Sequence, residues 1–192
     1  MHEQDKAHSV YIDSVKKTLS DLGLHGVWLN QSRIMFSLEW FKEEVKRCLM
    51  DQYIQKWFSQ INDPEKQIFT NYRICKDRFL QEKYISRLPV NHVISFARFR
   101  TLNNKLPVQV DRFTNTPRHE RLCTKCNLND VGDEYHAVLI CPYFSQQRKE
   151  LIPSVYWKRP SALKFQNLFS SNHWKTLTRL VKFINIVCKE FK

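Results

Sequence analysis

There are only three glycines and seven prolines among the 192 residues of this chain. Because these two residue types most strongly destabilise the interior of a helix, their scarcity leaves room for long helices. Long apolar runs are also absent, so we expect no segment that spans a membrane. The first residues are polar and of mixed charge and lack the apolar stretch of a secretory signal, which predicts an intracellular protein of the nucleus or the cytoplasm.

Known catalytic signatures are missing as well. The sequence contains none of the patterns that identify phosphate-binding loops, dinucleotide-binding turns, nucleophile elbows or helical zinc proteases. It also lacks the paired H-x-E and P-C-x-x-C motifs of zinc-dependent nucleobase deaminases. We therefore expect a protein that is not an enzyme.

The spacing of apolar residues is helical over most of the sequence. Apolar residues make up 42% of the chain and aromatic residues 13%, which favours a folded protein over a disordered one. The apolar spacing predicts helices over residues 5–22, 37–61, 91–102, 142–151, 161–170 and 172–191, and a further helix that starts at Pro64. Residues 107–113 alternate loosely and suggest a strand, and residues 28–36 suggest a short extended pair. We predict a mainly α fold.

Three residues are expected to fix the ends of these helices. Gly23 follows the helix over 5–22 and is expected to stop it, because glycine adopts the left-handed conformation without steric cost. Ser37 and Asn91 each precede an apolar periodic stretch, and their side chains are expected to cap the helices that follow.

Positive charge is concentrated in the later part of the chain, whose formal net charge is +12. Residues 1–63 carry eight Lys and Arg against nine Asp and Glu, whereas residues 64–192 carry 23 against ten. A basic region of this size favours a polyanionic partner, most often a nucleic acid, although a basic surface without a partner is the alternative. We predict three regions: a helical docking or linking region over 1–90, a module with basic flanks over 91–153, and packing helices over 154–192.

The stretch LCTKCNLNDVGDEYHAVLICP, residues 122–142, holds three of the six cysteines. It spaces four ligand-type side chains as C-x2-C-x9-H-x4-C, namely Cys123, Cys126, His136 and Cys141. A C-x2-C turn commonly directs two thiolates at one tetrahedral Zn²⁺, and a His and a Cys at the second spacing can converge from the end of a short helix. The spacing therefore predicts a zinc site.

Turn chemistry agrees with that prediction. Residues 127–132 supply turn-forming side chains, so the chain can double back between the two ligand pairs, and Asp133 is expected to cap the helix that carries His136. Four protein ligands leave no coordination position for a catalytic water, so the predicted zinc is structural. We expect a small zinc-knuckle-like hairpin and helix embedded in a helical domain.

Other interpretations remain open at this point. The cysteines could be scattered by chance, and His119 could replace one ligand. Cys48 and Cys188 fall on apolar helix faces and are expected in the core, whereas Cys75 could be buried or accessible. Glu134 is expected to be a carboxylate close to the ligands or exposed to solvent, rather than a catalytic base.

The segments FRTLNNKLPVQVDRF (99–113) and ERLCTKCNLNDVGDEYHAVLICPYFSQQRKELIP (120–153) resemble the C-terminal zinc-binding region of reverse transcriptases from non-LTR, LINE-type retrotransposons. Residues that match the pattern of that family are Arg121, Cys123, Cys126, Glu134, His136, Leu139, Cys141, Pro142, Phe144 and Arg148. The clear match covers residues 96–153. Gln109 and Asp111 depart from the Glu and Gly that are frequent in the family.

The paired aspartates of the polymerase do not occur, and the chain has no room for a polymerase core. The resemblance therefore implies a terminal module of a retroelement protein, or a remnant of one, that helps to hold RNA or DNA. Cations near the zinc motif are expected to contact phosphates. They are Arg98, Arg100, Lys105, Arg112, Arg118, Arg121, Lys125, Arg148 and Lys149.

Aromatic side chains near the motif allow a second kind of contact. Phe99, Phe113 and Tyr143 could stack on unpaired bases, although core packing is the more common role of such residues. The alternative function is a structural or protein-interaction module whose aromatic N-terminal helices dock on a reverse transcriptase core, with a structural zinc and no nucleic-acid contact.

Overall fold

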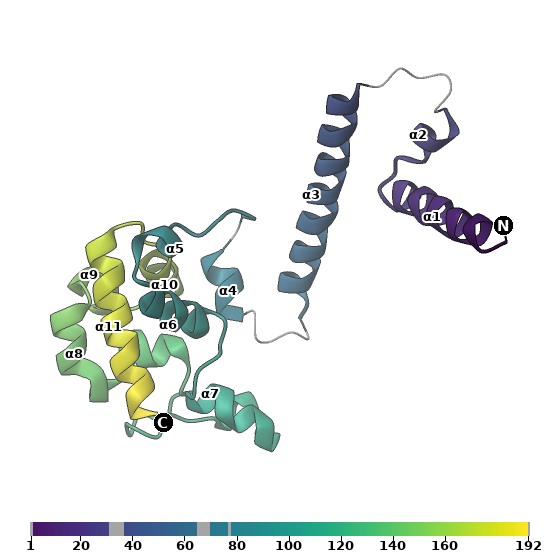
Figure 1. Cartoon of the computed structure of the whole chain (residues 1–192). Coiled ribbons are helices and arrows are strands. Elements are labelled where there is room, and N and C mark those ends of the chain that lie inside the picture. Colours follow the sequence, from purple (N-terminus) through teal and green to yellow (C-terminus); the bar gives the residue numbers. More distant parts are fainter. Residues whose placement is uncertain (1, 31–36, 65–69, 77, 192) are drawn as a thin grey trace. The chain divides into compact units, whose positions relative to one another are not determined.

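The computed structural model describes residues 2–30, 37–64, 70–76 and 78–191 (Figure 1). Every regular element in these ranges is helical, and the one β contact is an isolated antiparallel bridge between Leu122 and Val131. The predicted mainly α class is confirmed. The chain divides into two compact units, residues 1–60 and residues 61–192.

The first unit contains α1 (His2–Asp21), α2 (His25–Leu29) and most of α3 (Leu38–Asn62). Leu19, Leu22 and Leu24 form its small buried core, which side chains of α2 and α3 cover. Gly23 has a φ of 74° and ends α1, as predicted. The hydroxyl of Ser37 accepts a hydrogen bond from the backbone N–H of Trp40 at 3.1 Å, so the predicted cap of α3 is confirmed.

The predicted extended pair over residues 28–36 is wrong in its first part. Trp28 and Leu29 lie in α2, which begins directly after the turn at Gly23. Residues 31–36 of that prediction, and residues 65–69 of the helix predicted to start at Pro64, lie outside the described residues. None of the described helices has both the length and the apolar composition needed to cross a membrane.

The second unit is a set of short helices around one long C-terminal helix. In chain order they are α4 (Thr70–Cys75), α5 (Lys83–Arg87), α6 (Val90–Arg100), α7 (Pro107–Val110), the turns η2 (Asp111–Thr114) and η3 (Arg118–Glu120), the π-helical turn η4 (His136–Ile140), the turn η5 (Pro142–Phe144), α8 (Ser145–Leu151), α9 (Ser154–Trp157), α10 (Ala162–Phe169) and α11 (Trp174–Glu190).

Helix α11 supplies the centre of the core of this unit. Its buried face consists of Leu177, Leu180, Val181, Phe183, Ile184 and Val187. The rings of Phe96, Phe99 and Phe165 pack around Phe169, with centroid distances of 5.6, 6.0 and 4.4 Å. The same core also contains Cys75, Leu88 and residues of the cysteine motif.

This continuous core differs from the predicted division of the chain. Residues 61–90 belong to the same unit as the predicted module over 91–153, and the helices over 154–192 complete that core. The predicted packing of the helices over 154–192 on the module agrees with this core, whereas separating the chain at residue 90 would expose apolar side chains to water.

Two local predictions in this unit are corrected. Residues 107–113 are helical rather than a strand: Pro107 occupies the first turn of α7, where its fixed φ fits, and η2 follows without a break. Helix α6 begins at Val90 with Pro89 as its N-terminal flanking residue, so Asn91 lies inside the first turn and is not the cap.

Candidate metal centre

The first two candidate ligands lie on a hairpin that folds back between Arg121 and Gly132. The backbone N–H of Cys123 donates to the carbonyl of Asp130 at 2.9 Å, and the N–H of Gly132 donates to the carbonyl of Arg121 at 2.8 Å. These bonds close the predicted reversal and place Cys123 and Cys126 on the same turn.

Gly132 allows this hairpin to approach α7 closely. A Cβ atom at this position would lie 2.8 Å from Cγ of Pro107 and 3.0 Å from Cα of Cys123. Because the second contact is with backbone, a side chain here would push the two arms of the hairpin apart. The glycine therefore holds Cys123 in its observed place.

The other two candidate ligands lie at the two ends of η4. Asp133 Oδ1 accepts a hydrogen bond from the backbone N–H of His136 at 2.9 Å, which confirms Asp133 as the cap of this turn. The N–H of Cys141 donates to the carbonyl of His136 at 2.7 Å. This wide turn brings the side chains of His136 and Cys141 to one side, whereas Val138 and Leu139 pack into the core.

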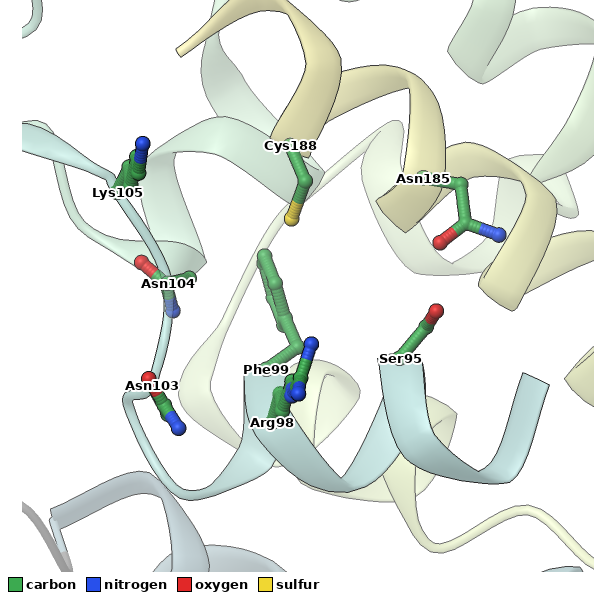
Figure 2. Close-up of a pocket in the computed structure, with 8 residues that line it drawn as sticks. All are labelled: Ser95, Arg98, Phe99, Asn103, Asn104, Lys105, Asn185 and Cys188. Atoms are coloured by element: carbon green, nitrogen blue, oxygen red, sulfur yellow. The ribbon is translucent and has the colours of Figure 1, made fainter. Parts of the chain in front are cut away.

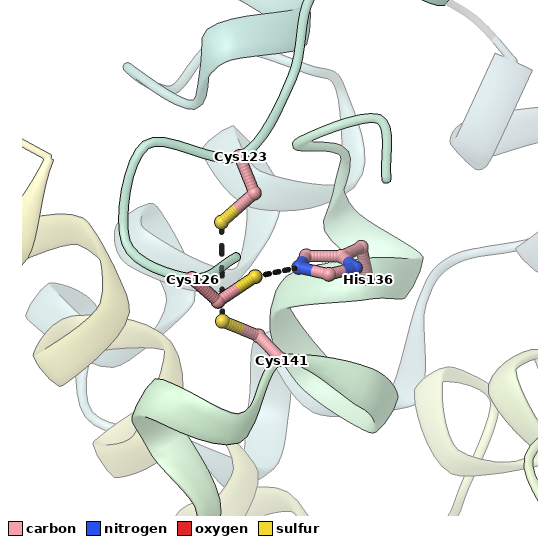
Figure 3. Close-up of side chains that lie close together, drawn as sticks. All are labelled: Cys123, Cys126, His136 and Cys141. Carbon is pink, nitrogen blue, oxygen red and sulfur yellow. Dashed lines mark hydrogen bonds between the residues drawn. The ribbon is translucent and has the colours of Figure 1, made fainter. Parts of the chain in front are cut away.

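The four ligand atoms converge at one point, as Figure 3 shows. All lie within 4.8 Å of one another. The sulfurs of Cys123 and Cys141 are 3.9 Å apart, and Cys126 Sγ lies 3.3 Å from Nε2 of His136. Zn–S bonds of about 2.3 Å at a tetrahedral angle would place two sulfurs about 3.8 Å apart. The cluster therefore has the dimensions of a four-coordinate metal site.

The orientation of His136 fits the same conclusion. Its Nε2 faces the sulfurs, and its buried Nδ1 makes no hydrogen bond within the protein, although a carboxylate oxygen of Asp130 lies 3.5 Å away. Metal-bound histidines commonly direct their second nitrogen toward a carboxylate, which fixes the ring and raises its basicity. Asp130 is in position to do this, a role that the sequence alone did not indicate.

Because the cluster is buried, ionising its cysteines to thiolates is unfavourable when no cation is bound. Desolvation raises the pKa of Cys123 and raises that of Cys141 to about 12, and it lowers the pKa of His136. Neutral imidazole is the form that binds metals. A divalent cation would offset the cost of ionising the buried thiols, because its charge stabilises the thiolates directly.

The side chain of Arg148 is buried against η4 and bonds its backbone, rather than facing solvent. Its guanidinium donates to the carbonyls of Val138, Cys141 and Ala137 at 2.7, 2.8 and 3.2 Å. The side chain is 4% exposed. The prediction that Arg148 contacts phosphate is therefore corrected: it satisfies backbone acceptors that the turn leaves open.

Two more predicted phosphate contacts are corrected for the same reason. Arg121 donates to the carbonyls of Val108 and Thr116 at 2.9 and 2.8 Å and is 8% exposed. Arg100 is 1% exposed and pairs with Glu82 at 2.8 Å. Both guanidinium groups are occupied inside the protein, so neither can reach a phosphate.

The remaining predicted cations lie at the surface in different settings. Arg98, Lys105 and Lys149 are exposed. Arg118 is 3.0 Å from Asp133 and so supports the cap of η4. The half-buried Arg112 and Lys125 lie over aromatic rings, those of Phe113 and of Tyr143 with Phe191 respectively. For these six cations, nucleic-acid contact stays a prediction.

The aromatic candidates divide between core and surface. Phe99 packs against Phe169 in the core, which is the role that its type most often has. Phe113 is 77% exposed, and the hydroxyl of the exposed Tyr143 donates to Glu190 at 2.7 Å. Phe113 and Tyr143 therefore remain available as surface aromatics.

The remaining sequence candidates lie outside the ligand cluster. His119 is exposed and does not belong to it, and Cys48 and Cys188 pack at the edges of the two cores. Cys75 is buried. Glu134 is not exposed: it accepts hydrogen bonds from Asn104 and from Gln109, at 2.8 and 3.1 Å, and burial raises its pKa.

Comparison with known proteins gave no match, since no family model, no curated protein and no solved structure matches this chain.

Proposed function

We propose that this chain is a non-catalytic, zinc-stabilised module that binds nucleic acid. The metal part of the proposal rests on the convergence of Cys123, Cys126, Cys141 and His136 within 4.8 Å. Three thiolates and one imidazole in a four-coordinate cluster are the donor set that structural zinc sites use. With all four positions taken by protein, the zinc would contribute folding free energy rather than reactivity.

The nucleic-acid part is supported by the exposed cations that remain after three arginines are assigned to the interior. Arg98, Lys105 and Lys149 are exposed, and they lie in the segment that carries all of the excess positive charge of the chain. Side chains of this kind neutralise phosphates and release counterions, which gives affinity with little choice of sequence.

The resemblance to the terminal region of retroelement reverse transcriptases supports the same proposal. Some of its motif residues have structural roles in this fold: Arg148 binds the backbone carbonyl of Cys141, Arg121 binds that of Val108, and Phe144 is buried in the core. In this proposal the chain is a terminal module that holds RNA or DNA, and a reverse transcriptase core is a second partner.

The experiment is a zinc determination followed by binding measurements on the same preparation. The chain purified without added metal is expected to contain about one zinc per molecule. Fluorescence titrations with single-stranded RNA, single-stranded DNA and duplex DNA, at several salt concentrations, should then show affinity that falls steeply with salt. A zinc-loaded chain that binds none of the three at low salt would refute the nucleic-acid function.

A specific observation favours a second function for residues 1–60. Leu38, Leu49, Met50 and Phe58 are apolar side chains of α3 that are all 40% or more exposed. Burying these exposed apolar side chains against a partner protein would be favourable. In that case the first unit docks on a polymerase core, and the metal site serves stability alone.

A further inference from the structure

The second unit has a cavity of about 360 Å³ between α6, the segment that follows it and α11 (Figure 2). Its lining residues are Ser95, Arg98, Phe99, Asn103, Asn104, Lys105, Asn185 and Cys188. Its size falls within the range of small-molecule sites in proteins, near the lower end. It is separate from the metal cluster, with which it shares no residue.

The cavity exists because the chain reverses sharply after α6. Leu102 has a φ of 57°, in the left-handed region, and the N–H of Asn103 donates to the carbonyl of Arg98 at 2.8 Å. A non-glycine residue adopts this conformation only at a steric cost. The reversal sends Asn103, Asn104 and Lys105 back past the end of α6.

The lining has three chemically distinct parts. Its apolar part lies at Cys188, toward which the buried ring of Phe99 points from the core in Figure 2. Ser95 and Asn185 face each other on one side of that ring, and Asn103 and Asn104 lie on the other. Arg98 and Lys105 provide two positive charges. None of the eight lining residues is acidic.

The positive charges of Arg98 and Lys105 are not paired with acidic side chains of the described part of the chain. Among the residues that the structure describes, neither Arg98 nor Lys105 has a carboxylate partner. The nearby Glu134 is buried behind Asn104, whose amide donates to it at 2.8 Å. Asn104 Oδ1 in turn accepts from the N–H of Leu106 at 3.1 Å, so this wall is fixed before any ligand arrives.

A second cavity of about 330 Å³ shares Lys105 with the first. Its lining also includes Thr124, which lies between Cys123 and Cys126 in the sequence, and the acidic Asp111. Lys105 is therefore the cation that both cavities share.

We propose that the first cavity receives one unpaired nucleotide of a single-stranded nucleic acid. A phosphate lies against Arg98 and Lys105, and the base enters between the amides of Asn103 and Asn185, against the half-buried Cys188. The inference rests on the proposed nucleic-acid function and names where the strand binds. A paired base is stacked inside its duplex and cannot enter, so single strands bind better than duplexes.

The test combines altered strands with a variant that fills the cavity. The probe is a labelled single-stranded oligonucleotide of about 12 nucleotides, in the range of common single-strand sites. Its partner is the same strand with abasic residues throughout, which keeps the phosphates and removes the bases. Ser95→Trp fills the cavity without changing charge, and Val90→Trp adds the same bulk to α6 at a position that is 76% exposed and outside the cavity.

The full-length chain is expected to bind the abasic strand about tenfold more weakly than the normal strand, the loss typical of one base contact. Ser95→Trp should weaken binding of the normal strand by a similar factor and leave the abasic strand unaffected, whereas Val90→Trp should bind both as the unmodified chain does. Circular dichroism checks the fold of each variant. The abasic comparison needs no variant, so it decides the matter if Ser95→Trp fails to fold.

Three results overturn the inference. Equal affinity for normal and abasic strands would show that no base occupies the cavity, and it would leave the proposed function intact. Competition by a free mononucleotide as strong as that by the strand reassigns the cavity to a free nucleotide. Absence of any strand binding overturns the proposed function itself, and the inference falls with it.

Discussion

The guanidinium of Arg148 donates a hydrogen bond to the backbone carbonyl of Cys141 at 2.8 Å, although the two residues are seven positions apart in the sequence. The same side chain also bonds the carbonyls of Val138 and Ala137. One buried arginine on α8 thus holds the turn that carries the last candidate ligand. The candidate metal site therefore depends on a side chain from outside the Cys123–Cys141 stretch that holds its four cluster residues.

Arg148→Met is expected to destabilise the second unit by about 2–4 kcal/mol, because several buried carbonyls lose their donor at once. It should also speed the transfer of zinc to a coloured chelator, since Cys141 loses its support. Lys149→Met is the matched control, because Lys149 is the exposed neighbour on α8. Equal melting temperatures and equal zinc release in the two variants would contradict a supporting role.

Cys123→Ser and His136→Ala are each expected to reduce the zinc content well below the roughly one atom per chain of the unmodified protein. Both should partly unfold residues 61–192, because the turn that carries His136 also contributes Val138 and Leu139 to the core. Cys48→Ser is the control, since Cys48 belongs to the first unit and lies outside the cluster. Zinc content is measured by atomic emission and folding by circular dichroism. Full zinc occupancy in either ligand variant would refute the ligand assignment.

The ligands could be predicted from the sequence because their signal is local. Four donors within 19 positions, a turn-rich link and the cap at Asp133 are all set by neighbouring residues, and so are the caps at Gly23 and Ser37. Each of these predictions depends on the chain within one turn of the residue concerned.

The roles of the arginines could not be predicted in this way. In the sequence Arg98 and Arg100 look alike, but Arg100 turns inward to Glu82, 18 residues earlier, whereas Arg98 remains exposed. Burial of a guanidinium depends on acceptors that distant segments bring to it, and composition does not record these. The alternation over residues 107–113 misled for a related reason: Pro107 fits a first helical turn as readily as a strand.

The ion pair between the half-buried Glu82 and the buried Arg100 predicts a pH dependence of stability. Glu82 accepts bonds from Arg100 at 2.8 Å and from Lys76 at 2.9 Å. Desolvation alone would raise the pKa of Glu82, but the hydrogen bonds and charges of Arg100 and Lys76 together outweigh it and hold that pKa below its ordinary value. A carboxylate with a lowered pKa stabilises the folded state above its unfolded pKa, and this contribution is lost as the pH falls through the folded pKa.

Glu82→Gln is therefore expected to lower the free energy of unfolding by about 1–3 kcal/mol near neutral pH. The difference from the unmodified chain should stay constant down to about pH 5 and shrink below it, because protonation then removes the same charge from Glu82. Urea unfolding of both proteins at a series of pH values measures this difference in the free energy of unfolding. Glu120→Gln is the control, since that carboxylate is 58% exposed. A difference that grows on acidification would show that the pair with Arg100 does not stabilise the fold.

Arg98 and Lys105 are expected to account for part of the salt dependence of nucleic-acid binding. The logarithm of the affinity falls as the logarithm of the salt concentration rises. Each phosphate contact that is removed should make the slope of this fall less steep by about 1, because one fewer counterion is released. Arg98→Gln and Lys105→Gln should therefore each lower it by that amount, and the double variant by about 2. Lys16→Gln, on the exposed side of α1 in the other unit, removes the same charge and should leave the slope unchanged. If all three single variants lower the slope equally, net charge alone drives the binding, and the second unit holds no defined phosphate path. If only the Arg98 and Lys105 variants lower the slope, the strand passes the cavity beside α6, because both of these cations line that cavity.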